Sequence, residues 1–269
     1  MYEQRLCAFV DILGFRDLVQ RSLDRPALQR QIRQLLREVV LARPIWERDS
    51  PVDLIEARLR LQGVTDPKAE ANQLVNEYAT AERGSSFSDS LVLSASLNDH
   101  AITGFVTSLL FLSRGIAELG KYARGAVCLG PLCHETDLCF GPALINAYDL
   151  EKNAEYPRIV FTLEAYAEVS KVQSPSVGPL TSYIREDIDG QRFLDFLNKA
   201  ALELAGSFRE DQMMEIRREL INQLSSSQVP DRVRKKLVWL AAYFNLALKD
   251  APIAGIDPLP TGTSNEIAV

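Results

Sequence analysis

Two aspartates interrupt apolar segments of the chain and are its best candidates for chemistry. Asp11 lies in Phe-Val-Asp-Ile-Leu-Gly-Phe (residues 9–15), and Asp89 lies in Ser-Phe-Ser-Asp-Ser-Leu (residues 86–91). A carboxylate in an apolar strand is costly unless it is paired, hydrogen-bonded or bound to a cation. If the two strands are neighbours, the carboxylates repel each other and a divalent ion between them relieves the repulsion. Oxygen ligands without a nearby imidazole favour Mg²⁺ or Mn²⁺ over zinc.

A glycine-led helix start follows the first aspartate. Gly14 and Phe15 would leave free backbone N–H groups and the positive end of a helix dipole beside Asp11, which suits phosphate oxygens. A plainer interpretation has Asp11 as a helix cap and Asp89 as a turn residue, and spacing alone leaves both open.

Two other patterns are weaker. Cys128, Cys133, His134 and Cys139 lack the close Cys-x₂-Cys pair of common zinc modules, so we expect core and hairpin residues there. The stretch from Gly115 to Lys121 approaches a phosphate-loop pattern, but it follows a predicted helix where that loop requires a strand.

The elements that must position these residues follow from periodicity and turn signals. We expect strands at 5–11, 87–96, 123–129 and 158–161, a turn-rich excursion over 130–139, and a hairpin over 183–196 that turns at Asp189-Gly190. Helices are expected at 16–42, 52–82, from Asp99 to about 116, and at 142–154, 163–169, 199–224 and 229–249. This order predicts an α+β, ferredoxin-like sheet that carries helices on one face.

Composition excludes several classes of protein. The chain has 269 residues, 46% of them hydrophobic and 25% charged, and a formal net charge of −6, which argues against a sequence-independent nucleic-acid binder. The longest uncharged central stretch, 101–113, is shorter than the ~20 residues of a membrane span. The first residues lack the apolar core of a signal peptide. Four cysteines in a chain of this size fit reduced thiols better than a disulfide framework, so we expect a cytoplasmic protein.

Taken together, the motifs resemble a known family. The segment around Asp11 looks like the first metal-binding motif of class III nucleotidyl cyclases, and the segment around Asp89 resembles the hairpin that carries their second metal-binding aspartate. Residues 124–127 and 140–148 continue the match. Residues 147–151, 154–160 and the Asp-Ile-Asp-Gly hairpin at 187–190 are similar to the Pycsar pyrimidine cyclases of antiphage defence. The resemblance covers most of residues 5–197.

The resemblance implies a two-metal cyclase. Asp11, Asp89 and the backbone carbonyl of Ile12 would hold two Mn²⁺ or Mg²⁺ ions, one lowering the pKa of the ribose 3′-hydroxyl and one gripping the triphosphate. Arg124 matches a phosphate-binding arginine, although an exposed strand-end charge is an equal alternative. The nucleotide would also meet residues of the first motif and its helix start, which are Phe9, Leu13, Gly14 and Phe15. The family implies a homodimer with interfacial sites, a nucleoside triphosphate substrate and a separate cyclic-nucleotide effector.

Departures from the family pattern concern the residues that recognise the nucleobase of the substrate. Purine cyclases carry a lysine where this chain has Ser85, and Ile145 and Asp149 replace the Asn and Arg of their helix motif. Asn146 lies one residue from the Asn position and is a candidate contact to the nucleotide. A pyrimidine triphosphate fits these losses, and family expectation favours UTP over CTP. Tyr78 is a candidate for restricting the base pocket, with an ordinary helix residue as its alternative. Three alternative functions remain open: a cytidylate cyclase, a purine cyclase, and a catalytically silent nucleotide-binding or interaction module.

The expected organisation has three parts. Residues 1–198 form the cyclase domain with a helical insertion at about 44–82, residues 199–250 form helices, and 251–269 form a flexible tail. The apolar residues from Leu237 to Leu246 either pack on the sheet or assemble a homodimer. The charges from Arg232 to Lys236 are expected to be the solvated start of a helix.

Overall fold

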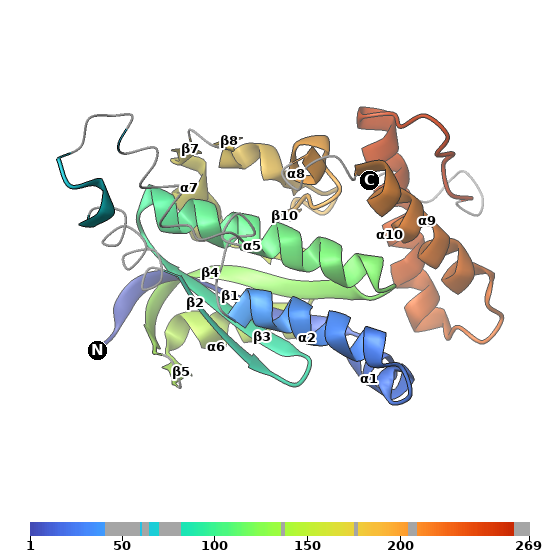
Figure 1. The fold of residues 1–269 in the computed structure, drawn as a ribbon, viewed down its shortest axis with the longest axis horizontal. Helices are drawn as coiled ribbons and strands as arrows, with labels where there is room; N and C mark the ends of the chain where they lie inside the picture. The colour runs from blue at the N-terminus through green and yellow to red at the C-terminus, as the bar shows by residue number, and fades with distance from the viewer. Residues whose placement is uncertain are drawn as a thin grey trace.

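A single sheet forms the centre of the molecule. The computed structural model describes residues 1–40, 60, 65–69, 82–135, 138–174, 177–203 and 209–260. Its eight-stranded sheet has the order β2-β3-β1-β4-β6-β10-β9, with β5 paired to β4, and helices pack around it (Figure 1). The α+β fold class predicted from the order of elements is confirmed.

Strand β1 (Glu3–Leu13) carries Asp11 and lies near the middle of the sheet. It runs antiparallel to β3 (Ser90–Ser96) on one side and to β4 (Tyr122–His134) on the other. Leu6, Ala8 and Val10 are fully buried on one face, while Phe9 and Asp11 point to the other. The side chain of Asp11 therefore lies on the face of the sheet opposite the main core.

The strand predicted over 87–96 is confirmed from Ser90 onward, and the hairpin that the cyclase resemblance implies around Asp89 is present, because the chain turns back at Ser88 and Asp89. Strand β2 (Glu82–Phe87) ends at a two-residue turn, and β3 begins at Ser90. Ser88 in that turn has a φ of 59°, the only positive φ of a non-glycine residue in the described part of the chain. Short polar residues form such turns, and this signal outweighs the apolar alternation that predicted one strand.

Helices cover both faces of the sheet, so the expectation of helices on one face is wrong. Helix α5 (Asp99–Glu118) packs with the apolar face of β1, and α6 (Pro142–Lys152) lies on the opposite side (Figure 1). The reason is that β4 runs parallel to β6 (Ile159–Phe161), and a parallel pair requires a crossover, here through α6.

Helix α5 is the core helix of the molecule. By length and composition it is the one described helix that could cross a membrane, but 78% of its most apolar window is buried inside the structure. An apolar helix buried on most sides is typical of the interior of a large domain.

The predicted excursion over 130–139 is also wrong, since β4 continues to His134 and pairs with β5 (Cys139–Phe140). Gly141 then starts α6 with a φ of 145°, and a Cβ there would lie 2.7 Å from the Pro131 carbonyl oxygen. Only glycine fits this close approach of α6 to β4.

The remaining elements complete the chain. The hairpin predicted at Asp189-Gly190 is confirmed, with Gly190 at a φ of 75°. The helix predicted over 199–224 is confirmed over residues 199–203 and 209–225, and residues 204–208 lie outside the described residues. The insertion expected at about 44–82 also lies almost wholly outside them. The other bounds are α1 (Phe15–Ser22), α2 (Pro26–Val40), α7 (Leu163–Ser170), β7 (Gln173–Ser174), β8 (Gly178–Pro179), η2 (Leu180–Tyr183), β9 (Ile184–Glu186), β10 (Arg192–Leu194), α8 (Lys199–Glu203) and α9 (Arg209–Ser225).

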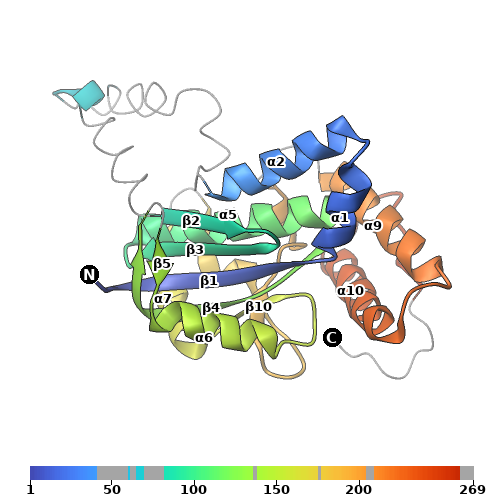
Figure 2. The ribbon, with the colours of Figure 1, turned by 90° about the horizontal axis from the view of Figure 1, so that it is seen from below.

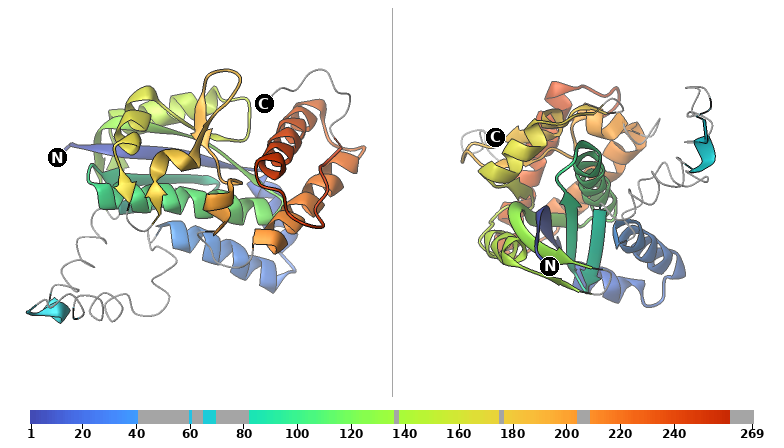
Figure 3. Two further views of the ribbon diagram at one scale, coloured as in Figure 1. Left: turned by 90° about the horizontal axis from the view of Figure 1, so that it is seen from above. Right: turned by 90° about the vertical axis from the view of Figure 1, so that its left-hand side faces the viewer.

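Helix α10 (Asp231–Asp250) docks on this same chain. It stands with α9 at the end of the sheet away from the N-terminus (Figure 3). Trp239 stacks on Tyr156 with ring centroids 5.5 Å apart, and its indole N–H donates to Asp187 at 3.2 Å. Asp187 also pairs with the buried Arg158. Of the two roles considered for the apolar surface of this helix, packing within the chain accounts for Leu237, Trp239, Leu240, Tyr243 and Phe244, which are all buried.

The segment after α10 is packed where a flexible tail was expected. Ile253, Ile256 and Leu259 are buried, and the Asn245 amide exchanges two hydrogen bonds with the backbone of Leu259. Residues 261–269 lie outside the described residues. Apolar residues at three-residue intervals anchor this segment in spite of its prolines and glycine.

The anchoring of α10 gives a stability prediction. Trp239→Ala removes a buried ring and is expected to lower the free energy of unfolding by about 3–5 kcal/mol, measured by denaturant titration. Val233→Ala, on the same helix at a residue 43% exposed, is expected to change it by less than about 0.5 kcal/mol. Equal effects of the two substitutions would show that α10 is not held by this contact.

Candidate active site

The register of β1 with β3 and β4 brings the candidate side chains together at one end of the sheet. Asp11 lies opposite Ser90 of β3 and opposite Arg124 of β4. Residues directly opposite in an antiparallel pair point to the same face. The Arg124 Nη2 and Asp11 Oδ2 atoms are accordingly 3.6 Å apart.

Asp89 reaches the same end of the sheet through the β2–β3 turn. The Ile12 backbone N–H donates to the carbonyl oxygen of Asp89 at 2.9 Å, which fastens the turn to the end of β1. Asp89 is half-buried, and its negative charge acts on Asp11. The structure thus brings Asp11, Ile12 and Asp89 together, although the side chain of Ile12 itself is buried in the core.

Arg124 is held by a residue that sequence reasoning did not single out. Glu151, in the last turn of α6, is buried, and its Oε1 accepts from Arg124 Nε at 2.6 Å and Nη2 at 2.5 Å. The Arg124 side chain is only 14% exposed. A signal was present, because Ala143, Ala147 and Glu151 repeat every four residues, which places a carboxylate on the inner side of α6.

The surroundings of Asp11 make its charged form unfavourable. Burial raises its pKa to about 6, and the negative charges of Glu151 and Asp89 add to the rise. Arg124 and Lys236 act in the opposite direction without cancelling it. An under-compensated carboxylate beside two others is the arrangement that a bound cation stabilises.

These residues fit the ligand preferences of a divalent ion. Within the described ranges, no group of three or more His, Cys, Asp or Glu side chains forms a cage for a metal. Mg²⁺ is usually bound by one or two carboxylates together with substrate phosphates and water, and does not need such a cage. Asp11 and Asp89, with the Ile12 carbonyl, are the donors available for it here.

The start of α1 lies directly after this carboxylate pair. Gly14 has a φ of 78° and caps α1, with its carbonyl accepting from the Leu18 N–H at 3.2 Å. A Cβ at Gly14 would lie 3.3 Å from the Lys121 Nζ, so the ammonium stands over the glycine. Lys121 also pairs with Asp17 at 2.6 Å. A lysine at the end of the rejected phosphate-loop pattern therefore lies beside the predicted phosphate amides.

The other residues predicted to contact the nucleotide, where the structure describes them, form no hydrogen bond or ion pair with the side chains of Asp11 or Asp89. Phe9 lies two residues before Asp11 on the same face and packs edge-on against Tyr148 of α6, with centroids 5.3 Å apart. Leu13 and Phe15 are half-buried, while Asn146 is exposed on α6. Tyr78 lies outside the described residues.

Ser85 is engaged in a buried polar network. Its hydroxyl and that of Ser94 each lie 2.9 Å from a ring nitrogen of His134, and Arg5 Nε donates to the Ser94 hydroxyl at 3.0 Å. His134 is buried, and its pKa is lowered to about 4 by burial and by nearby arginines. The position that carries a base-reading lysine in purine cyclases is thus tied to the protein interior.

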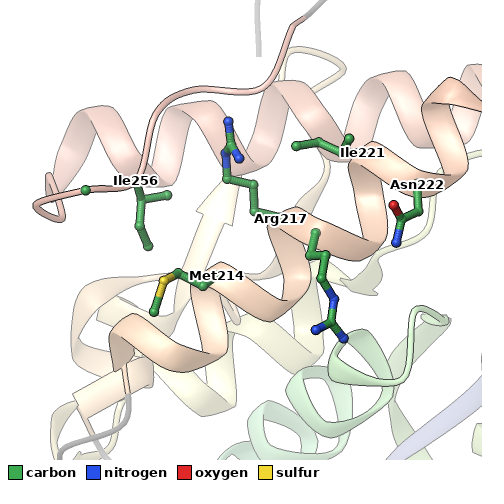
Figure 4. Close-up of a pocket in the computed structure, with 7 residues that line it drawn as sticks. Met214, Arg217, Ile221, Asn222 and Ile256 are labelled. Carbon is green, nitrogen blue, oxygen red and sulfur yellow. The ribbon is translucent and has the colours of Figure 1, made fainter.

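A separate hollow of about 290 Å³ lies between α9 and the C-terminal segment (Figure 4). Met214, Arg217, Ile221, Asn222 and Ile256 line it, and none of the predicted site residues does. Arg217 Nε donates to the carbonyl oxygen of Asp257 at 2.7 Å, so this arginine fastens the C-terminal segment to α9.

Comparisons with known proteins give weak structural likeness only. No protein-family model matches the chain, and no curated protein matches it. The adenylyl cyclase CyaB from P. aeruginosa is 14% identical over 72% of this chain and 94% of its own, with a TM-score of 0.40. The monomeric guanylyl cyclase domain of the RhoGC fusion protein from the aquatic fungus Blastocladiella emersonii is 13% identical over 71% and 94%, with a TM-score of 0.35. The chemistry of this chain therefore has to be inferred from its own residues.

The raised pKa of Asp11 predicts an unusual stabilisation by its amide variant. The folded pKa of about 6 exceeds the ordinary 3.8, so the stabilising contribution of the protonated carboxyl is complete below pH 3.8 and is lost as the pH rises through 6. In metal-free protein at pH 8, Asp11→Asn is expected to raise the free energy of unfolding by on the order of 2 kcal/mol, and by little at pH 4.

Asp17→Asn is the matched control for that measurement. The pKa of Asp17 is lowered by its hydrogen bond to Lys121, so its amide variant is expected to be no more stable than the wild type at pH 8. Denaturant titrations at the two pH values measure both effects. A loss of stability at pH 8 in Asp11→Asn would contradict the under-compensated state of Asp11.

Proposed function

We propose that this protein is a Mg²⁺- or Mn²⁺-dependent nucleotidyl cyclase acting on pyrimidine nucleoside triphosphates. The observation that carries the proposal is the convergence of Asp11 and Asp89 at the end of β1, directly before the glycine-capped start of α1. Carboxylates that can hold divalent ions, placed next to amides and cations that can hold phosphates, are the parts that phosphoryl transfer requires.

Each residue then has a defined task. Asp11, Asp89 and the Ile12 carbonyl would hold the ions, which when bound acidify the ribose 3′-hydroxyl and neutralise the triphosphate. Arg124, fixed by Glu151, orients its remaining guanidinium donors toward phosphate oxygens. Leu13, Gly14 and Phe15 offer backbone amides to the terminal phosphates.

The reaction is an internal displacement at the α-phosphorus. The 3′-oxygen attacks, a new P–O bond closes the 3′,5′-cyclic monophosphate, and the bond to the β-phosphate oxygen breaks. The hydroxyl proton goes to water, and diphosphate leaves. No protein nucleophile is required, so catalysis consists of positioning and charge stabilisation.

UTP is the favoured substrate, with cyclic UMP as the product. Ser85 is hydrogen-bonded to His134, and Ile145 and Asp149 are exposed, so the residues that read purines in related enzymes have no equivalent here. The preference for UTP over CTP rests on the Pycsar resemblance. In that setting the product is a second messenger for a separate effector in antiphage defence, made in the cytoplasm.

An exposed apolar surface supports a homodimer with interfacial sites. Phe87 lies opposite Ser90, and Ser90 lies opposite Asp11, so the three point to the face on which α6 packs. Phe87 is 85% exposed, and Ile145 and Tyr148 on α6 are 60% and 45% exposed. Large exposed apolar side chains next to a site indicate a surface that a partner covers.

Product analysis tests the activity. Incubation with each of the four nucleoside triphosphates and Mn²⁺, followed by chromatography, is expected to give cyclic UMP as the main product. Asp11→Ala and Asp89→Ala are expected to reduce the rate by more than a factor of about 10³, since each removes a metal ligand. Asp24→Ala, which removes an exposed carboxylate on the surface, serves as the control and should leave the rate unchanged.

The alternatives give different results in the same assay. Cyclic CMP or a purine cyclic nucleotide as the main product would overturn the UTP assignment. Stabilisation of the fold by nucleotides without any cyclic product would instead indicate a silent nucleotide-binding module. Full activity of Asp11→Ala would refute the metal assignment.

The dimer has its own test in Phe87→Asp. A charge in the centre of an apolar interface is expected to shift the protein toward monomer and lower specific activity at least about tenfold. Light scattering and activity at matched concentrations measure the two effects. Leu163→Asp, at a residue 70% exposed on α7, is the control, and equal behaviour of both variants would contradict an interface at Phe87.

A further inference from the structure

Helix α10 reaches the end of the sheet that carries the site. Lys235 Nζ pairs with Glu155 at 2.6 Å, and the neighbouring Ala154 carbonyl lies 3.4 Å from Arg124 Nη1. The first turns of α10 thus run along the segment that leads out of α6, next to Arg124. Figure 2 shows α10 beside α1, close to the end of β1.

Lys236 lies on the side of this helix that turns inward. It is half-buried, whereas Lys235 before it is exposed, and Leu237 after it is buried. Its charge acts on the carboxylates of Asp11 and Glu151 and on the guanidinium groups of Arg124 and Arg232. Burial and the two arginines lower the pKa of Lys236, and the two carboxylates offset this in part.

The cations near the end of β1 differ in whether they are already paired. Lys121 pairs with Asp17, and Arg124 pairs with Glu151. Lys236 and Arg232 have no hydrogen bond or ion pair with any residue that the structure describes. A half-buried ammonium without a partner is unfavourable, and an anionic ligand between it and Arg124 removes the penalty.

We propose that Lys236, assisted by Arg232, binds the β- and γ-phosphates of the nucleotide, so that α10 forms part of the active site. The inference deepens the proposed function and rests on it for the identity of the ligand. A triphosphate carries about four negative charges, and the chain as a whole has a net charge of −6, so binding depends on cations concentrated locally. A lysine supplies a compact charge with three donors, which suits terminal phosphates without fixing their geometry.

The two neighbouring lysines allow a matched experiment. Binding of tripolyphosphate and of 3′-deoxy-UTP, each with Mn²⁺, is measured by calorimetry on the full chain. Lys236→Met is expected to weaken both affinities at least tenfold and to raise KM more than it lowers kcat, while Lys236→Arg keeps most of the affinity. Lys235→Met, which removes an exposed lysine paired with Glu155, is expected to change either affinity less than twofold.

The outcomes separate this inference from the proposed function. If Lys236→Met binds tripolyphosphate as tightly as the wild type, or if Lys235→Met loses as much affinity, the inference is overturned even if the enzyme makes cyclic UMP. If the wild type binds tripolyphosphate through Lys236 but makes no cyclic nucleotide, the phosphate site stands and the cyclase proposal falls. A wild type that binds neither ligand overturns both. Thermal unfolding of each variant shows whether the fold is intact.

Discussion

The register of β1 between β3 and β4 is the constraint on which the candidate site depends, because it fixes the position of an incompletely neutralised carboxylate. Asp11 is brought to the end of β1 by strand register, and that register cannot slip without exposing Leu6, Ala8 and Val10. Burial and two further carboxylates oppose its ionisation. The cationic groups around it, Arg124 and Lys236, leave the balance of charge at this end of the sheet incomplete.

Two helices from outside the sheet control that balance. Glu151 at the end of α6 fixes the Arg124 guanidinium, and α10 adds a second layer of positive charge over the same region. The buried contacts of Trp239 with Tyr156 and Asp187 hold α10 in place. The stability of the C-terminal helices and the electrostatics of the candidate site are therefore linked through the residues that follow α6.

The sequence was sufficient for the fold class, the Asp189-Gly190 hairpin and α6, because each has a strong local signal. Periodicity alone did not show the turn at Ser88, since alternation of apolar residues continues across a two-residue turn, whereas the cyclase resemblance implied a hairpin there. It also missed that β4 reaches His134, that helices cover both faces, and that the segment from Ile253 to Leu259 is packed. The pairing of Glu151 with Arg124 and the position of Lys121 over Gly14 arise from tertiary contacts between distant segments, so helical spacing could place Glu151 on the inner side of α6 but could not identify its partner.

The position of α10 relative to β1 also has a consequence for biosynthesis. The two elements are separated by more than two hundred residues of chain, yet α10 stands at the end of the sheet where β1 ends (Figure 3). A ribosome must therefore translate almost the whole of residues 1–250 before the surroundings of Asp11 are complete. Chains that end before α10 would leave the rings of Tyr156 and Phe193 without their contacts to Trp239, and exposed apolar surface of this kind makes incomplete chains prone to aggregation.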